Sequence, residues 1–244
     1  MPRRPSRSRR LTTALRWPAG VALTSWTYMW RTTVLHRREI EGTPGEDGPP
    51  PLPAGVERSE VQEASAGVGP LFHRVYRSRV RGGRLSAADL MARLQADPNR
   101  VAPTELASFQ KVHGEEGAMR VGDEYVVRMP GPWDGPIRVV AVGPRSFRFA
   151  TLDGHLEAGQ IEWAAADADG DLLFRIESWA RGGDRLSYLL HHRLRMAKEV
   201  QLHMWTSVHE RVARLAGGRL TGGIDIETRR VDAPAGVGAD QRPS

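Results

Sequence analysis

The chain contains no cysteine. This absence excludes disulfide bonds, thiolate zinc sites and cysteine nucleophiles, and it is typical of proteins in a reducing compartment. A long apolar run is missing too, because the most apolar stretch, 17–35, is interrupted by proline, glycine, serine and threonine. A membrane-spanning helix needs about 20 mostly apolar residues, and the stretch also lacks a clean signal-peptide cleavage pattern. We therefore predict a cytoplasmic protein, with peripheral attachment to a membrane as the alternative.

Established catalytic and cofactor motifs are missing as well. The glycine-rich pieces at 81–84 and 181–183 do not have the spacing of a phosphate-binding loop, and no Gly-x-Ser-x-Gly nucleophile elbow occurs. The aspartates of 167–171 resemble the start of a calcium loop, but Leu172 and Ser178 stand where that loop needs glycine and an acid. A hairpin turn explains this run better. The sequence thus predicts no cofactor and no metal site.

The positive charge is concentrated at the beginning of the chain. The formal net charge is +6, and six arginines stand among the first 16 residues without an acid. The remainder is close to neutral, so the basicity is not the footprint of a nucleic-acid-binding domain. We treat residues 1–41 as a basic and aromatic arm that packs on the domain or stays loose. A contact with an anionic membrane surface through residues 1–38 is the functional alternative, and a nucleic-acid partner is less favoured.

Composition divides the rest of the chain into three parts. Residues 42–69 are rich in Glu, Gly and Pro, so we predict a linker that is extended or disordered. The folded domain is expected at 70–217. Residues 218–244 are predicted to be a tail that is mostly disordered.

The first half of the domain shows both helical and strand patterns. Ser86 is a suitable N-cap for a helix over 87–96 that ends before Pro98. A second short helix is predicted after Thr104. Alternation of apolar and polar residues predicts the strands, which are 71–80, 124–129 and 137–142.

The second half of the domain is the most informative part. Three β-like segments, 146–151, 155–165 and 172–180, are joined by turns that contain Asp-Gly, a strong hairpin signal. From Asp184 to Gly217 the period changes to 3.6, which predicts a helix of about 30 residues, roughly 45 Å long. We therefore predict an α+β fold, a curved antiparallel sheet wrapped around a long C-terminal helix. This helix-grip arrangement usually encloses a cavity.

An apolar stripe along the predicted helix indicates the face that covers the sheet. It consists of Leu186, Leu190, Leu194, Ala197, Val200, Met204, Val208, Val212 and Leu215. His192, Glu199 and His203 share another face, where the last two have the four-residue spacing of a metal pair. Because that face projects away from the stripe, we expect these side chains to be exposed to water rather than to bind a metal.

The candidate binding site lies on one face of the segment 155–165. His155, Glu157, Ile161 and Trp163 point to the same side, because alternate side chains of a strand share a face. This mixture of polar and apolar groups predicts a cavity with a polar mouth and an apolar floor. The alternative is that the first two are simply exposed beside a turn. The predicted ligand-binding residues are Phe147, Phe149, His155, Glu157, Ile161, Trp163, Phe174 and Met204.

Two stretches carry a family resemblance. Residues 154–163, GHLEAGQIEW, and 173–179, LFRIESW, followed by the long helix, resemble the DUF1990 family of bacterial and plant proteins. The resemblance covers roughly 71–215 and implies no known activity. It marks as family residues Gly154, His155, Gly159 and Glu177. The order of elements also resembles the helix-grip proteins of the START and Bet v 1 superfamily, which commonly bind apolar ligands, although fold does not fix function.

Beside an interaction of the basic arm with a membrane surface or nucleic acid, two functions of the domain remain open at this point. The first is a binding module that holds an apolar or lipid-like small molecule between sheet and helix, with His155 and Glu157 orienting a polar end at the mouth. The second is an enzyme acting in the same cavity, with His155 as general acid or base and Glu157 orienting it. We rank binding first, because no second catalytic group is convincing.

Overall fold

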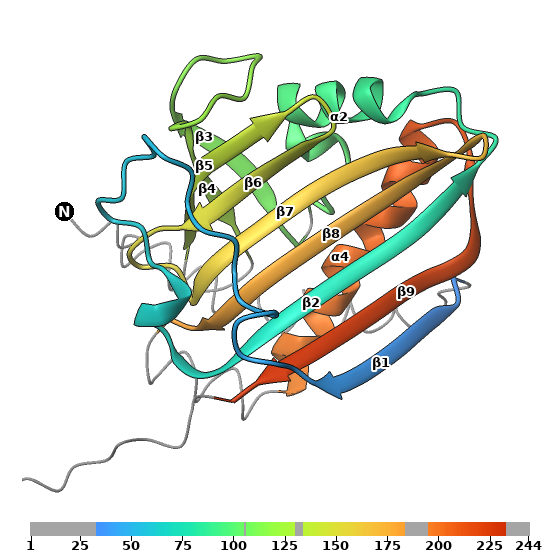
Figure 1. The fold of residues 1–244 in the computed structure, drawn as a ribbon. Coiled ribbons are helices and arrows are strands. Elements are labelled where there is room, and N and C mark those ends of the chain that lie inside the picture. The colour runs from blue at the N-terminus through green and yellow to red at the C-terminus, as the bar shows by residue number, and fades with distance from the viewer. Residues whose placement is uncertain (1–32, 105, 130–133, 184–194, 233–244) are drawn as a thin grey trace, which may run out of the picture.

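The computed structural model describes residues 33–104, 106–129, 134–183 and 195–232, with the side chains of the last helix described from residue 202 onward (Figure 1). Nine strands form one curved sheet in the order β1-β9-β2-β8-β7-β6-β5-β4-β3. Neighbouring strands are antiparallel except β1 and β9, which are parallel. The strands are β1 (Leu35–Glu41), β2 (Val68–Arg81), β3 (Ser108–His113), β4 (Glu124–Arg128), β5 (Asp134–Gly143), β6 (Ser146–Thr151), β7 (Glu157–Ala168), β8 (Asp171–Gly182) and β9 (Arg219–Val231). The helices are η1 (Ala64–Ala66), α2 (Ala87–Ala96), η2 (Pro98–Arg100) and α4 (Arg195–Leu215).

Most of the local predictions for the domain are confirmed. Helix α2 starts after Ser86, whose hydroxyl accepts a hydrogen bond from the Asp89 N–H at 3.1 Å. The short helix predicted after Thr104 is wrong, because the chain there leads into strand β3. The Asn99 side chain binds the main chain of Phe109 through both its oxygen and its nitrogen, at 2.7 and 2.8 Å, and so holds this edge strand extended.

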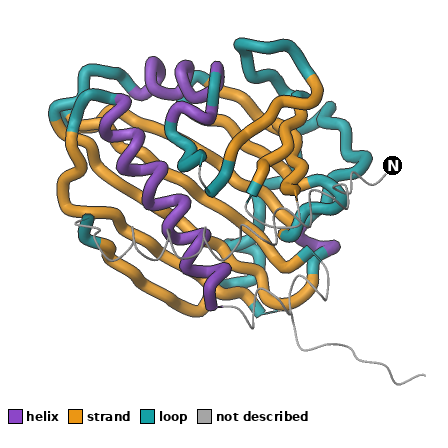
Figure 2. The backbone as a smooth tube through the Cα atoms, turned by 180° about the vertical axis from the view of Figure 1, so that it is seen from behind, coloured by secondary structure: helices purple, strands orange, loops and turns teal. Residues whose placement is uncertain are grey.

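Helix α4 lies across one face of the sheet, as Figure 2 shows from behind. We call this face the inner face and the opposite one the outer face. The Trp205 ring on α4 meets the Trp163 ring on β7 edge to face, with centroids 6.1 Å apart. The expected architecture, a curved sheet gripped by a long C-terminal helix, is therefore confirmed. No described helix is long and apolar enough to cross a membrane.

The buried face of α4 is wider than the predicted stripe. Met204 and Leu215 are only half-buried, whereas Trp205 and His209 are buried. His203 is 5% exposed, so the expectation that it meets water is wrong. The helix is enclosed from several sides, because Arg211 donates to the Ala102 carbonyl at 3.0 Å and the Thr33 hydroxyl donates to a carboxylate on the same helix.

Two parts of the predicted helix lie outside the described structure. Residues 184–194, which include Leu186, Leu190, His192 and Leu194, are outside the described residues, and so are the side chains of Ala197, Glu199 and Val200.

Both ends of the domain extend further than predicted. Residues 219–231, expected to belong to a mostly disordered tail, form β9 in the middle of a three-strand group with β1 and β2. Ile224 is fully buried there, and Ile226 is 6% exposed. The end of the basic arm forms β1, which pairs with β9 from Leu35↔Ile224 to Glu41↔Arg230. These strands escaped prediction because their polar residues are mostly arginine and glutamate, and their partners are far away in the sequence.

The predicted linker, residues 42–69, packs on the outer face of the sheet, and we call it the cover segment. Leu52 and Val56 are buried against Val140 and Ala150 of the sheet. Main-chain carbonyls of this segment accept hydrogen bonds from the sheet, such as that of Pro50 from the Gln160 side chain at 2.9 Å. Of the two expectations for this linker, extended or disordered, disorder is wrong, because prolines fix the backbone while the sheet supplies hydrogen-bond donors to its carbonyls.

Candidate functional site

An aromatic cluster fills the centre of the inner face. Phe147, Phe149, Trp163 and Phe174 are each 1% exposed. The Phe147 ring lies 5.3 Å from that of Phe149 and 5.4 Å from that of Trp163, and Trp163 and Phe174 are 6.2 Å apart, edge to face. These four side chains were predicted to contact the ligand. They pack on one another and form the apolar floor of the candidate site.

Half-buried apolar side chains border this floor. Ile161 of β7 and Met204 of α4 both pack on the aromatic cluster while keeping part of their surface open, and so does Phe109 of β3. Trp205, the neighbour of Met204, is 9% exposed, and its indole Nε1 is buried without a hydrogen-bond partner among the described residues. A buried N–H without an acceptor destabilises the folded protein. A ligand that supplies an acceptor would therefore gain binding free energy from this hydrogen bond.

His155 was expected to begin the strand over 155–165, but it lies in the turn region before β7, which starts at Glu157. Its Nδ1 lies 2.9 Å from the main-chain nitrogen of Glu157 and 3.0 Å from the carbonyl oxygen of the same residue, so this ring nitrogen is engaged with the main chain in either tautomer. The ring lies so close to Gly135 that a Cβ there would be 2.9 Å from Nε2. Burial lowers the pKa of His155, which favours the neutral ring at physiological pH.

A second histidine on the inner face was not singled out from the sequence. His209 is fully buried, and its Nδ1 lies 2.7 Å from the Ser78 hydroxyl. Its ring stands edge-on to Phe174, with centroids 5.0 Å apart. Burial lowers its pKa to about 3 and raises that of Tyr76 to about 12, so both groups are neutral. The helical period alone could have placed His209 beside Val208 and Val212.

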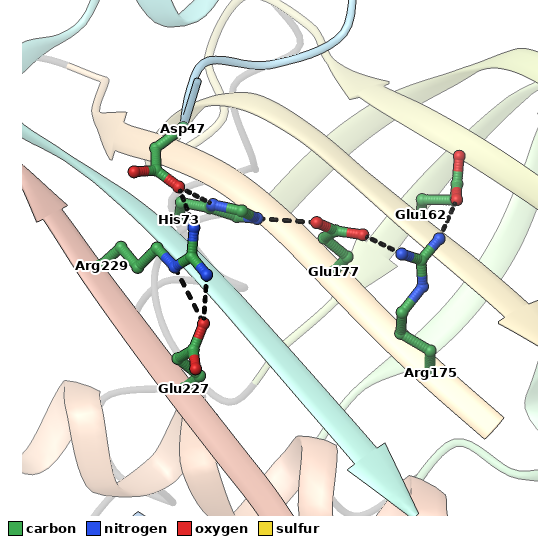
Figure 3. Close-up of polar contacts among 7 residues, drawn as sticks. All are labelled: Asp47, His73, Glu162, Arg175, Glu177, Glu227 and Arg229. Carbon is green, nitrogen blue, oxygen red and sulfur yellow. Dashed lines mark hydrogen bonds and ion pairs between the residues drawn. The ribbon is translucent and has the colours of Figure 1, made fainter. Parts of the chain in front are cut away.

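The outer face carries a chain of charged side chains (Figure 3). His73 of β2 is 8% exposed and lies between two carboxylates. Its Nδ1 is 2.8 Å from Asp47 in the cover segment, and its Nε2 is 2.7 Å from Glu177 of β8. Because each carboxylate accepts, both ring nitrogens carry a proton and the ring is an imidazolium. The Trp179 ring stacks on it at 5.3 Å.

Arginines extend this chain in both directions. Arg175 contacts Glu177 at 2.6 Å and Glu162 at 2.8 Å, and Arg229 of β9 contacts Asp47 at 3.0 Å. We call the seven residues the outer-face network; they are Asp47, His73, Glu162, Arg175, Glu177, Glu227 and Arg229. In the described ranges no three His, Asp or Glu side chains are arranged to hold a metal ion. The network instead ties the cover segment to β2, β8 and β9.

The pKa values of the network follow from its hydrogen bonds. Burial alone would lower the pKa of His73, but its bonds to Glu177 and Asp47 outweigh burial and raise it. Burial would likewise raise the pKa of both carboxyls. For Asp47 the Thr43 N–H, His73 and Arg229 outweigh burial, for Glu177 the His73 bond and the Arg175 charge do, and both pKa values are lowered. All three groups are thus held in their charged forms.

The residues marked by the family resemblance have structural roles in this chain. A Cβ on Gly159 would lie 1.8 Å from the Trp179 carbonyl oxygen, so no larger residue fits between β7 and β8. Gly154 has φ +93°, a left-handed turn conformation that glycine adopts without strain. Glu177 belongs to the outer-face network. The sequence could mark these positions, but the partner of Glu177 lies 104 residues away, and no local pattern reveals it.

Comparisons with known proteins give a family and several distant structures. The family described as "Domain of unknown function (DUF1990)" matches residues 59–211. No curated protein matches the chain.

Solved structures similar to this chain come from bacteria and plants. One is hypothetical protein jhp0584 from Helicobacter pylori (TM-score 0.44, 8% identity, 58% of this chain and 86% of that one). Others are norcoclaurine synthase from Thalictrum flavum (0.41, 9%, 63% and 89%) and major latex-like protein 151 from Panax ginseng (0.38, 17%, 58% and 97%). Likenesses at such identities say nothing of activity.

Proposed function

Because the chain belongs to the DUF1990 family, whose description names no function, we propose one from the site itself: the protein binds an apolar small molecule between the inner face and α4. Fold alone does not support this choice. The observation that carries it is the buried indole N–H of Trp205, which has no acceptor in the described part of the chain and stands beside half-buried apolar side chains. A ligand with an apolar body and one acceptor group supplies what is missing.

In the proposed complex each predicted residue has a distinct place. The buried rings of Phe147, Phe149, Trp163 and Phe174 support the ligand from below. Ile161 and Met204 contact its apolar body, and its carbonyl or carboxylate oxygen accepts from Trp205 Nε1. His155 and Glu157 stand at the rim. We assign the polar end to Trp205 rather than to His155, because the Nδ1 of that ring is already occupied.

The test uses cis-parinaric acid, a fluorescent fatty acid with a carboxylate acceptor. Trp205→Phe keeps a ring but removes the N–H. We expect it to raise the dissociation constant about tenfold, which is the effect of losing one hydrogen bond to a charged group. Met204→Trp should also weaken binding by occupying the border of the site. The matched control is Trp179→Phe, the same substitution on the outer face. Equal affinities for wild type, Trp205→Phe and Met204→Trp would refute the proposal.

Native mass spectrometry of the purified full chain is an independent check. A co-purifying molecule with an apolar body should appear with the wild type and be reduced with Met204→Trp. A ligand that stays with Met204→Trp but is displaced by changes on the outer face would place binding elsewhere.

A further inference from the structure

A cavity lies on the outer face, away from the site proposed above. Its volume is about 400 Å³, within the range of small-molecule sites. The cover segment supplies one side through Pro44 and the run 48–52, and the sheet supplies the other through Leu71, Gln160 and Arg181. Prolines and aliphatic side chains thus make up much of its wall.

Two of the lining residues each have a buried polar atom without a hydrogen-bond partner among the described residues. These atoms are Gln160 Oε1 and Arg181 Nε. Gln160 is only 9% exposed, and its Nε2 donates to the Pro50 carbonyl at 2.9 Å, which leaves the oxygen as the open acceptor. Buried polar groups are normally paired, so an unused acceptor and an unused cationic donor on two residues that line one cavity favour a polar ligand there.

The two residues stand on rigid elements and face the same side of the sheet. Gln160 pairs with Trp179 across β7 and β8, and Arg181 is two residues further along β8, so they are diagonal neighbours. The cover segment above them is held by Asp47, which contacts both His73 and Arg229. The cavity is therefore preorganised, and a ligand would not have to order its walls.

Charges around the cavity favour a single negative charge on the ligand. Glu63 is paired with Arg58 at 3.7 Å, and Asp232 is paired with Arg230 at 2.9 Å, so neither acid stands without a cation. Arg181 contributes a guanidinium that, within the described part of the chain, donates a long hydrogen bond of 3.4 Å from Nη1 to the Gly69 carbonyl. A carboxylate can accept from its Nε.

We propose that this outer-face cavity binds a small carboxylic acid that carries an N–H group on an apolar body, the chemistry of an N-acylated amino acid. The carboxylate accepts from Arg181 Nε, the amide N–H donates to Gln160 Oε1, and the apolar body packs on the prolines and on Leu52 and Leu71. This site is independent of the inner-face function.

The experiment titrates N-acetyl-leucine into the full-length protein and follows the indole N–H signals of its tryptophans by NMR. Trp179, opposite Gln160, should shift, whereas Trp163 and Trp205 should not. Gln160→Met and Arg181→Met should each weaken binding about tenfold. Arg77→Met, an exposed change on the same face, and Trp205→Phe should leave it unchanged.

The ligand can be altered as well, which keeps the proposal falsifiable if a variant does not fold. N-acetyl-N-methyl-leucine lacks the N–H, and the methyl ester of N-acetyl-leucine lacks the charge, so each should bind about tenfold more weakly to the wild type. Absence of saturable shifts at millimolar N-acetyl-leucine would overturn the proposal. So would equal affinity for all three ligands, or shifts confined to Trp163 and Trp205.

Discussion

At the scale of single residues, His73 has the most demanding environment. A buried imidazolium between two carboxylates is stable only while all three groups keep their charges. The raised pKa of His73 gives stability that is complete below its ordinary value of 6.5 and is lost as the pH rises through the raised value. The lowered pKa values of Asp47 and Glu177 give stability that is complete above their ordinary values of 3.8 and 4.5 and is lost at lower pH. The network therefore stabilises most between pH 4.5 and 6.5.

His73→Gln tests this window. The variant removes the cation from a buried charge network, so near pH 6 we expect it to lower the free energy of unfolding by about 3 kcal/mol. The difference from wild type should shrink as the pH rises above 6.5, because the unfolded chain then loses the His73 proton, and the stabilisation is gone once the pH passes the raised pKa of the folded ring. Urea denaturation at several pH values measures this, with Arg93→Gln, at an exposed position of α2 outside the network, as the control. A difference that stays constant with pH would show that His73 is not charged in the folded protein.

At the scale of elements, strand β9 decides where the domain ends. Ile224 is fully buried and pairs with Leu35 of β1 and Ser78 of β2. Ile224→Ala should cost about 2–5 kcal/mol of unfolding free energy, the usual range for a buried isoleucine. Val121→Ala, at a residue that is 50% exposed, should stay within about 0.5 kcal/mol of wild type. Equal effects in urea denaturation would mean that β9 contributes nothing to the fold.

A comparison of the helices and strands with the sequence shows which of them local patterns can predict. Helix α2 and the hairpins of β6, β7 and β8 could be predicted, because an N-cap and Asp-Gly turns act over a few residues. Strand β3 could not, since Asn99 holds it from outside the strand. On the inner face, alternation located the aromatic floor. The outer-face network could not be predicted, because His73 is 26 residues from Asp47 and 104 from Glu177.

At the scale of the whole molecule, the positive charge is concentrated in the basic arm at the beginning of the sequence. Its six leading arginines suggest attraction to anionic lipid, worth about 1 kcal/mol for each arginine near the surface. We expect the full chain to float with vesicles that contain phosphatidylserine, and a variant with these six arginines changed to glutamine to lose this. Vesicles of phosphatidylcholine alone are the control. Equal flotation of both proteins would exclude the arm as the attachment.

The parallel pairing of β1 with β9 has a practical consequence for this domain. The range 59–211 that matches the family excludes both strands and also Asp47. A fragment cut to those limits would leave the 14-residue strand β2 without its neighbour on one side. An exposed edge strand of this length can form hydrogen bonds with strands of other molecules. Such a fragment should self-associate, while the intact polypeptide shields that border with its own two ends.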